Sequence, residues 1–413
     1  MALTPILISG VGRSGTTALM ALLGTDARVV FDRCYPFENR SLTYLVKSSL
    51  LLDRAGVGAF DQSKLVDFAD NTLGPAPWVP ESVPFPSSQS WLEQGWSLMS
   101  DVALRNRRDG LWYAEKVSYW LPPLIRAVMP CRTIHLVRDP RDVWLSIVEF
   151  GRRRPTVGFG VELEQLDQAR MLAHQWASFA ENERADASGT SSQRVRYEDM
   201  VQDLQSVAAN LNAWLALALD PCKEETRGNL AQHATSASPS KSVERWKHEP
   251  LAEQVERALL APLCADLARY GYPASHVSPA PRFTPDATWP HSGQAAGQPT
   301  NDGMQLTAVG PDLWFLVRAP SFDAAGVSEV WLCMEAGTGD HCSIYWRAPG
   351  QPFDESRGVH MPYLPGPHRQ IIRLPVSSHA LWSGEIEELR VDVFNGAIVP
   401  DRPGRFCWVQ LVP

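Results

Sequence analysis

The sequence predicts an α/β domain built on a mainly parallel sheet, followed by an all-β sandwich. In its first 275 residues, short apolar runs of strand type alternate with segments that have helical apolar spacing. Residues 276–301 contain five prolines and no sustained periodicity, which is typical of a linker. Beyond residue 302 only strand patterns recur, with turn residues between them. We therefore expect an α/β domain over residues 1–275, a linker over 276–301 and a jelly-roll-like sandwich over 302–413.

The composition is that of an ordinary globular protein, with 44% apolar and 20% charged residues. A net charge of −8 argues against broad nucleic-acid binding, although it allows a local basic pocket for one anionic ligand. No apolar run approaches the roughly 20 residues of a membrane-spanning helix. The seven cysteines are scattered without a Cys-x-x-Cys pair, which favours reduced thiols. We expect a cytoplasmic protein without a transmembrane segment.

Residues 5–17 carry the strongest local signal. An apolar run at 6–8 enters a loop punctuated by glycines at its two ends, 10 and 15, and a helical pattern then begins at Thr16. Loop amides and a helix N-terminus together bind phosphate groups. The spacing resembles a Walker A loop, but Thr16 stands where that loop has its lysine, and the nearest charge is Arg13. This predicts a P-loop-like sheet with an altered anion site.

The other elements of the first domain continue the alternation, which favours a parallel sheet flanked by helices. Strand patterns cover residues 28–31, 111–116, 131–137 and 194–199. Helical patterns cover residues 42–52, 65–73, 91–107, 121–129, 163–182, 200–219 and 251–270.

A second anion site is predicted where the strand pattern 131–137 ends. Arg138 follows that strand directly, Asp139 is suited to cap the next helix, and Ser146 lies eight residues beyond Arg138 in that helix. In open parallel sheets, ligands bind at the carboxyl ends of the strands. The run 152–154, three arginines, is typical of a solvated helix end, although it could extend this site or meet an anionic acceptor.

These two segments resemble the sulfotransferases that use 3′-phosphoadenosine 5′-phosphosulfate (PAPS), and the resemblance covers residues 1 to about 273. It implies that one set of residues grips the 5′-phosphosulfate: Arg13, Ser14, Gly15, Thr16 and Thr17. It also implies that Arg138 and Ser146 bind the 3′-phosphate. Two further segments look like motifs of the family, Arg196–Met200 and Lys241–Trp246, which adds Tyr197 and Lys241 as expected donor contacts.

The resemblance also implies catalytic residues. Lys116 matches a family lysine near the transferring group, whereas the position of the histidine base of small-molecule members holds Ser118. Glu38 is the best candidate for the base, because it follows the second strand, as does the glutamate base of members that act on glycans and on protein tyrosine. Asp32 and Glu115 are weaker rivals. A carboxylate suits removal of a proton from a sugar hydroxyl.

Two separate anion sites suit a donor with two separate anionic ends, whereas a nucleoside triphosphate needs contiguous phosphate contacts and an acid for Mg²⁺. We expect transfer of the PAPS sulfonate to a hydroxyl, on a saccharide or glycan precursor, without a metal. The alternatives are a small-molecule kinase with a degenerate P-loop and a glycan-binding protein without turnover.

The last part of the chain has strand patterns rich in aromatic residues. They cover residues 313–318, 329–335, 343–347, 370–374, 388–394 and 406–412. The pattern resembles β-sandwich modules fused to bacterial glycan-synthesis enzymes. Its aromatic side chains either contact carbohydrate or fill the sandwich core and a domain interface.

Overall fold

A computed structural model of the chain describes most of its residues. The described ranges are 3–38, 40–52, 88–105, 109–153, 159–160, 162–186, 189–223, 235–292, 295–309, 313–337, 339–363, 366, 368–395 and 404–413. The predicted helix 65–73 lies outside them. The chain forms two compact units: an α/β unit of residues 1–155 and 186–248, and a β unit of residues 156–185 and 249–413. Residues 249–275 and 163–182, expected in the first domain, therefore group largely with the second part.

The α/β unit contains a five-stranded sheet in the order β2-β3-β1-β4-β5, in which every neighbouring pair is parallel. This confirms the predicted fold class. The strands are β1 (Thr4–Ser9), β2 (Val29–Val30), β3 (Trp112–Val117), β4 (Arg132–Val137) and β5 (Ser192–Arg196). The central strand β1 is buried from Pro5 to Ser9, because helices cover both faces of the sheet.

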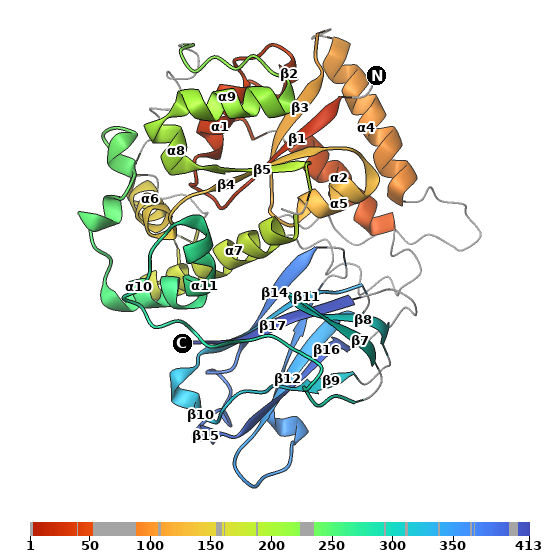
Figure 1. Cartoon of the computed structure of the whole chain (residues 1–413), viewed down its shortest axis with the longest axis vertical. Coiled ribbons are helices and arrows are strands. Elements are labelled where there is room, and N and C mark those ends of the chain that lie inside the picture. Colours follow the sequence, from red (N-terminus) through yellow and green to blue (C-terminus); the bar gives the residue numbers. More distant parts are fainter. Residues whose placement is uncertain are drawn as a thin grey trace. The chain divides into compact units, whose positions relative to one another are not determined.

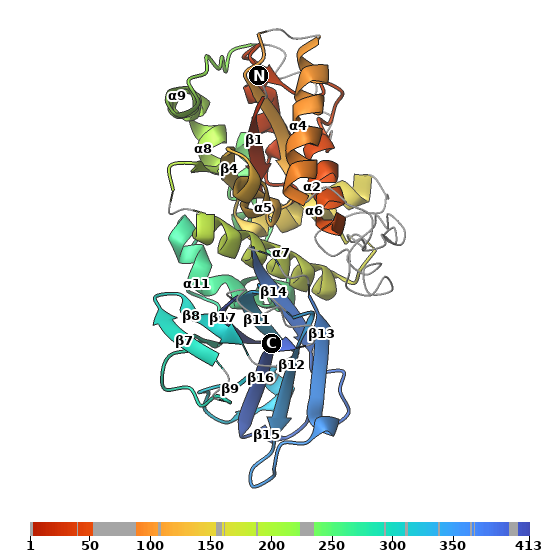
Figure 2. The same ribbon diagram turned by 90° about the vertical axis from the view of Figure 1, so that its right-hand side faces the viewer.

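Helices pack on both faces of this sheet (Figures 1 and 2). They are α1 (Thr16–Leu23), α2 (Ser41–Leu52), α4 (Ser88–Arg105), α5 (Leu121–Val128), α6 (Pro140–Arg153), α8 (Tyr197–Gln202) and α9 (Leu204–Leu215). Successive β1 side chains point to opposite faces. Ile6 and Ile8 therefore pack with α1, α8 and α9, whereas Leu7 packs with α2, α4 and α5.

All five parallel strands end at one edge of the sheet, which places the predicted site. The loop 10–15 leaves β1, Arg138 follows β4, and Tyr197 follows β5. Lys116 lies at the end of β3. Two short 3₁₀ turns, η3 (Ser240–Ser242) and η4 (Arg245–Lys247), complete this unit.

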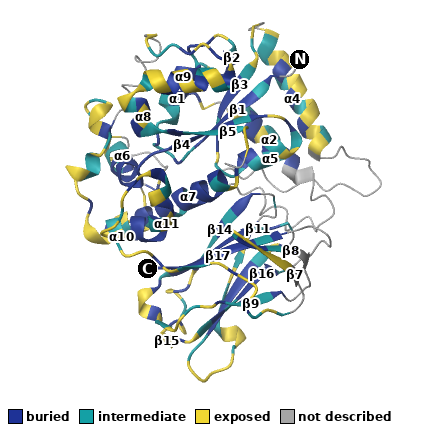
Figure 3. Ribbon diagram, viewed as in Figure 1, coloured by how far each residue is buried: buried dark blue, intermediate teal, exposed yellow. Residues whose placement is uncertain are grey.

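The β unit contains a sandwich of antiparallel sheets, as predicted. One sheet has the order β14-β11-β17-β8-β7 with β6 paired to β17, another has the order β13-β12-β16-β9, and β10 pairs with β15. The main sheets share one core, in which Leu332, Ile344, Val391 and Val409 are fully buried (Figure 3).

The elements of the β unit are numerous. Its strands are β6 (Arg282–Phe283), β7 (Ala295–Thr300), β8 (Gly303–Val309), β9 (Trp314–Leu316), β10 (Phe322–Asp323), β11 (Glu329–Glu335), β12 (His341–Arg347), β13 (Gly358–Pro362), β14 (Arg369–Pro375), β15 (Glu385–Ile386), β16 (Glu388–Asn395) and β17 (Gly404–Val412). Its helices are α7 (Gln165–Asp186), α10 (Glu253–Leu260), η5 (Ala261–Leu263), α11 (Cys264–Leu267), η6 (Ala268–Tyr270), η7 (Ala324–Gly326) and η8 (Glu355–Arg357). Strands β6 and β7 fall within the expected linker.

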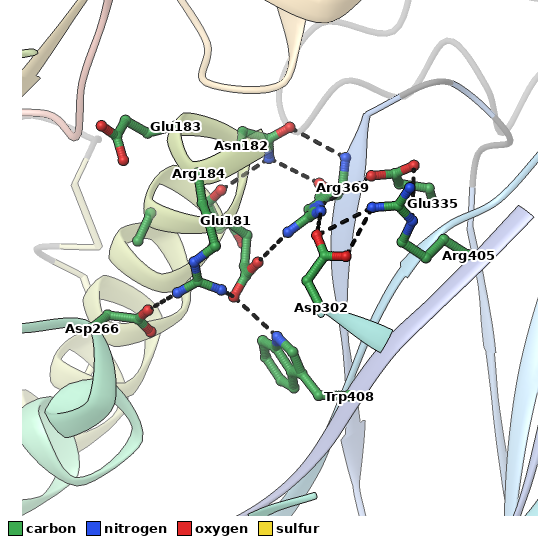
Figure 4. A network of polar contacts seen from close by, with 12 residues as sticks. Glu181, Asn182, Glu183, Arg184, Asp266, Asp302, Glu335, Arg369, Arg405 and Trp408 are labelled. Carbon is green, nitrogen blue, oxygen red and sulfur yellow. Dashed lines mark hydrogen bonds and ion pairs between the residues drawn. The ribbon is translucent and has the colours of Figure 1, made fainter. Parts of the chain in front are cut away.

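Helix α7 is joined to the sheet of the β unit by a network of buried ion pairs (Figure 4). The Glu181 carboxylate accepts a hydrogen bond from Arg369 at 3.1 Å and one from the Trp408 indole at 2.9 Å. Arg369 also pairs with Glu335, at 3.0 Å, and with Asp302. Because Arg369 is only 3% exposed, its charge depends on these carboxylates rather than on water.

All seven cysteines are free thiols. Cys333 lies in β11 and Cys342 in β12, which belong to different sheets, so the two thiols do not face each other in a hairpin. In the described part of the chain, no helix is both long and apolar enough to cross a membrane.

Candidate functional site

The loop between β1 and α1 is held in a conformation that requires glycine. Gly15 has φ 97°, and a Cβ added there would lie 2.4 Å from the ring of Tyr197. A Cβ at Gly10 would lie 2.8 Å from the Leu136 carbonyl oxygen. Between them the Ser14 amide donates to the Val11 carbonyl at 3.1 Å. The loop therefore packs against both β4 and the residue after β5.

The N-terminus of α1 faces this loop. Gly15 is the N-cap residue and contributes no side-chain cap to the first amides of the helix. The Thr17 hydroxyl accepts a hydrogen bond from the Lys116 ammonium at 2.8 Å. Helix amides, hydroxyls and a cation are thus gathered at one point, which is an arrangement that binds anions.

Arg138 connects the loop to the segment near residue 242. Its guanidinium donates to the Arg13 carbonyl at 2.9 Å and to the Ser242 carbonyl at 2.7 Å. It lies 4.3 Å from the centre of the Tyr197 ring, and the Tyr197 hydroxyl is 2.8 Å from the Ser242 hydroxyl. Two backbone carbonyls and an aromatic ring thus contact the guanidinium, and the Asp142 carboxylate interacts with it electrostatically.

The structure also brings Arg13 and Ser146 into contact, although the sequence assigns them to opposite ends of the ligand. The Arg13 Nε donates to the Ser146 hydroxyl at 3.3 Å, and the guanidinium lies 4.6 Å from the Phe150 ring centre. Ser146 and Phe150 are four residues apart on α6 and so share a face of that helix. The Ser146 hydroxyl is also 2.9 Å from the Thr235 hydroxyl. The two expected anion sites are therefore neighbours.

Lys116 forms the opposite side of the loop. Its ammonium donates to the Pro36 carbonyl at 2.7 Å as well as to Thr17, and it lies 3.6 Å from the Glu38 carboxylate. The side chain is 12% exposed, and burial lowers the pKa of the ammonium to about 8 despite the opposing effect of Glu38. Lys116 is therefore a charged group that loses its proton close to neutral pH.

The three candidate carboxylates have different surroundings. Glu115 is buried, accepts the Leu42 and Thr43 amides at the start of α2, and so caps that helix. Asp32 accepts the Cys34 amide in an exposed turn at 2.9 Å. Glu38 is half exposed and lies beside the Lys116 ammonium. Of the three, Glu38 is the carboxylate that contacts Lys116.

Lys241 lies at the edge of this cluster. Its side chain is exposed and its amide donates to the Ser238 hydroxyl at 3.4 Å. The neighbouring Ser242 makes the contacts with Arg138 and Tyr197, and sequence reasoning missed it. Among the residues that the structure describes, no three His, Cys, Asp or Glu side chains are placed to hold a metal ion. Cations, hydroxyls and helix amides form a donor set suited to an anionic organic ligand.

A family model described as "Sulfotransferase family" matches residues 5–221, more than half of the chain. No curated protein matches.

Three solved structures illustrate the likenesses. The sulfotransferase domain from the curacin biosynthetic pathway has 20% identity, covers 66% of this chain and 99% of its own, and gives a TM-score of 0.40. A sulfotransferase from Alicyclobacillus acidocaldarius has 14% identity, covers 67% of this chain and 99% of its own, and gives a TM-score of 0.36. A low-affinity xylan-binding module from Roseburia intestinalis has 14% identity, covers 32% of this chain and 92% of its own, and gives a TM-score of 0.24.

Proposed function

The chain belongs to the sulfotransferase family, and we propose that it transfers the sulfonate group of PAPS to a hydroxyl on a saccharide. The observation that carries the proposal is the cluster of Arg13, Arg138 and Lys116 around one glycine-dependent loop at the end of β1. Each of these cations is fixed in part by hydroxyls or carbonyls, which orient a positive charge without cancelling it.

The donor fits the residues that are present. Its 5′-phosphosulfate would lie at the N-terminus of α1, where the amides after Gly15 and the hydroxyls of Thr16 and Thr17 are available for hydrogen bonds. Its 3′-phosphate would be bound by Arg138 and Ser146. Arg13 contacts Ser146, and its backbone carbonyl accepts from Arg138, so it lies where it can serve either anionic end.

The reaction proposed is an in-line displacement at sulfur. The bond between sulfur and the bridging oxygen of the 5′-phosphate breaks, and its electron pair remains on that phosphate. A new bond forms between sulfur and the acceptor oxygen, whose proton passes to Glu38. Arg13 and Lys116 stabilise the negative charge that grows on the leaving phosphate. The Lys116 ammonium and the Glu38 carboxylate are 3.6 Å apart, so the stabilising cation and the proposed base lie at the same end of the loop.

Calorimetry separates this proposal from the kinase alternative. Binding of 3′,5′-ADP with a submillimolar dissociation constant in the absence of Mg²⁺ is the expected result. Binding of ATP with Mg²⁺, but not of 3′,5′-ADP, would contradict the sulfotransferase proposal. A glycan-binding protein without turnover would bind the nucleotide but consume no PAPS with a panel of hydroxyl acceptors.

The role of Glu38 has its own test. Glu38→Gln keeps the size of the side chain and removes the base, so turnover is expected to fall by about 100-fold or more while donor affinity changes little. Asp32→Asn tests the rival carboxylate a few residues away, which is exposed and caps a turn, and its turnover should change little. Unaltered turnover in Glu38→Gln would remove Glu38 from the role of base.

One face of the sheet β13-β12-β16-β9 supports the proposal that the acceptor is a saccharide. Strand residues alternate between the faces, and Phe315, Ile344 and Val391 point into the core. Their neighbours therefore occupy the other face, where Trp314 is paired with Asp392, and Tyr345 with Arg390. The Arg390 guanidinium lies 5.4 Å from the Trp314 ring and 5.3 Å from the Tyr345 ring.

Tyr345 and Asp392 are themselves buried, whereas Trp314 and Arg390 are partly exposed and can contact a sugar. The Trp314 ring can pack on the apolar side of a pyranose, and the Arg390 guanidinium can hydrogen-bond with its hydroxyls. Arg390 is held by Asp392 through two bonds of 2.8 and 2.7 Å, so both polar groups are already oriented. Titration with oligosaccharides is expected to show binding that Trp314→Ala weakens by about tenfold. Trp91→Ala, at an exposed tryptophan on α4, is the control, and equal binding by both variants would contradict this acceptor surface.

A further inference from the structure

The segment 240–247 is attached to helix α6 by two buried residues in the first turn of that helix. Asp142 accepts a hydrogen bond from the Trp246 amide at 3.1 Å, and the Glu244 amide also donates to its carboxylate. Glu244 has φ 54°, a left-handed conformation that is uncommon outside glycine. The backbone at Glu244 is thus held in a strained form with its amide directed to Asp142.

Arg141 makes the second attachment. Its guanidinium lies 3.5 Å from the centre of the Trp246 ring, a close cation–π contact. Two hydrogen bonds of 2.9 and 2.6 Å from Arg141 to the Asp139 carboxylate fix its orientation. Arg141 is fully buried and Asp142 is 1% exposed, so neither is an ordinary solvated residue at a helix start.

The attached segment contributes to the candidate site through Ser242. The Ser242 carbonyl accepts from Arg138 at 2.7 Å, and its hydroxyl contacts Tyr197 at 2.8 Å. Ser242 lies only two residues before Glu244, so the position of its carbonyl depends on where Glu244 and Trp246 are held. Asp142 thereby influences the orientation of Arg138 through the backbone of the segment.

The Asp142 carboxylate is a costly group to keep in this place. Its Oδ2 is buried and has no hydrogen-bond partner among the described residues. Burial raises the pKa of this carboxyl to about 6, against the opposing effect of the nearby Arg138 guanidinium. The hydrogen-bonded oxygen of this buried carboxylate accepts from two amides of the strained segment 240–247. We therefore infer that the carboxylate serves to hold the segment in place.

We propose that Asp142 and Arg141 are positioning residues that hold segment 240–247 on α6, so that Ser242 orients Arg138 toward the 3′-phosphate of the nucleotide. The role of Arg138 in binding the 3′-phosphate rests on the proposed function, whereas the attachment of segment 240–247 to α6 does not. Neither residue needs to touch the ligand. Their effect should therefore be confined to ligands that carry the 3′-phosphate.

The experiment compares Asp142→Ala with Asp142→Asn in the full chain. Hydrogen exchange measured by mass spectrometry over residues 240–247 reports the attachment in the free protein. Asp142→Ala should raise exchange at the Glu244 and Trp246 amides by about tenfold or more, because it removes the carboxylate that accepts from both amides. Asp142→Asn keeps one acceptor oxygen and should stay within about threefold of the unmodified chain.

Calorimetry then tests the consequence for binding. Asp142→Ala should weaken 3′,5′-ADP by about 10- to 30-fold and 5′-AMP by less than twofold, and Asp142→Asn should restore most of the loss. Trp246→Ala serves as a second test if Asp142→Ala does not fold, because it removes the ring that contacts the Arg141 guanidinium. It should weaken 3′,5′-ADP by about threefold and leave 5′-AMP nearly unchanged.

Each outcome decides one point. Unchanged exchange in Asp142→Ala would overturn the attachment, whether or not any nucleotide binds. Faster exchange with an equal loss for both nucleotides, or with no loss, would overturn the positioning role. Failure of the unmodified chain to bind 3′,5′-ADP would contradict the proposed function and with it the 3′-phosphate role, while the exchange data would still decide the attachment.

Discussion

The arginines that stabilise the β unit and those at the candidate site of the α/β unit have different surroundings. In the β unit, Arg369 and Arg184 meet carboxylates: Arg369 pairs with Glu181 at 3.1 Å, and Arg184 with Glu181 at 2.5 Å. In the α/β unit, Arg13 contacts a hydroxyl and an aromatic ring, and Arg138 contacts two carbonyls and a ring.

The difference separates stabilising cations from binding cations. A carboxylate cancels the charge of a buried guanidinium and ties two elements together, and removal of one partner leaves the other uncompensated. A carbonyl or hydroxyl fixes the direction of the guanidinium but leaves its positive potential for a ligand. Lys116 is intermediate, since it has two neutral acceptors and Glu38 at 3.6 Å.

The largest effect is expected from Arg369→Ala. This change removes the most deeply buried arginine partner of Glu181 and Asp302, which keep only the more exposed Arg184 and Arg405, so the free energy of unfolding should fall by about 3 kcal/mol. Chemical denaturation followed by tryptophan fluorescence measures the loss. The affinity of the folded protein for 3′,5′-ADP should stay within about twofold, since Arg369 stabilises the β unit rather than the donor site.

Arg170→Ala is the control for that prediction. Arg170 lies on α7, the helix that carries Glu181, and pairs with Asp167 at 3.2 Å, but the Asp167 side chain is 60% exposed. Its loss should change the unfolding free energy by about 0–1 kcal/mol. Equal losses in the two variants would show that burial of the ion pair does not distinguish them.

The second largest effect is expected from Arg138→Ala. Loss of a charged donor to the proposed 3′-phosphate should weaken 3′,5′-ADP by about 100-fold, with a much smaller effect on 5′-AMP. Because the Arg13 and Ser242 groups that accept hydrogen bonds from Arg138 are carbonyls, which can stay hydrated without it, the melting temperature should change less than in Arg369→Ala. A large loss of stability with little loss of affinity would place Arg138 with the stabilising arginines.

The sequence predicted the local parts of the site well. An apolar strand, a glycine loop and a helix start are all encoded within residues 5–17, and Arg138 follows its strand directly. The contact between Arg13 and Ser146 was not predicted, because it joins residues 133 positions apart through the packing of α6. The contacts of Ser242 with Arg138 and of Asp142 with Trp246 were not predicted. They involve backbone groups of the short 3₁₀ turns η3 and η4, which have no apolar periodicity.

The β unit was predicted less completely. Strand β7, with the sequence Ala-Ala-Gly-Gln-Pro-Thr, is an edge strand whose glycine and proline are typical of turns, so its segment was assigned to the linker. Helix α7 was predicted, but not that it groups with the strands beyond residue 302. Its buried face includes Glu181, and a charged residue on a helix is usually expected to face solvent.

A moderate effect is expected from pH through Lys116. Its folded-state pKa of about 8 lies below its usual value of 10.5, so the ammonium loses its proton as pH rises through 8. Affinity for 3′,5′-ADP should then fall, by up to about tenfold between pH 8 and 9.5. The folded state binds fewer protons than the unfolded chain between about pH 8 and 10.5, so the stability contribution of Lys116 rises over that range.

Calorimetry across this pH range, with Lys116→Met as control, tests the assignment. The variant cannot titrate and should bind more weakly at pH 7.5 but with little further loss toward pH 9.5. The same alkaline loss in the variant and the unmodified chain would assign the titration to another group.

The smallest effect is expected from Arg152→Ala. Arg152 and Arg153 both pair with Glu149 near the end of α6, and their side chains are 74% and 49% exposed. Such solvated pairs contribute little, because water already screens the charges. The melting temperature should shift by less than about 1 °C and the affinity for 3′,5′-ADP by less than twofold. A tenfold loss of affinity would instead place Arg152 with Arg13 and Arg138, as an arginine whose charge remains available to the ligand despite its carboxylate partner.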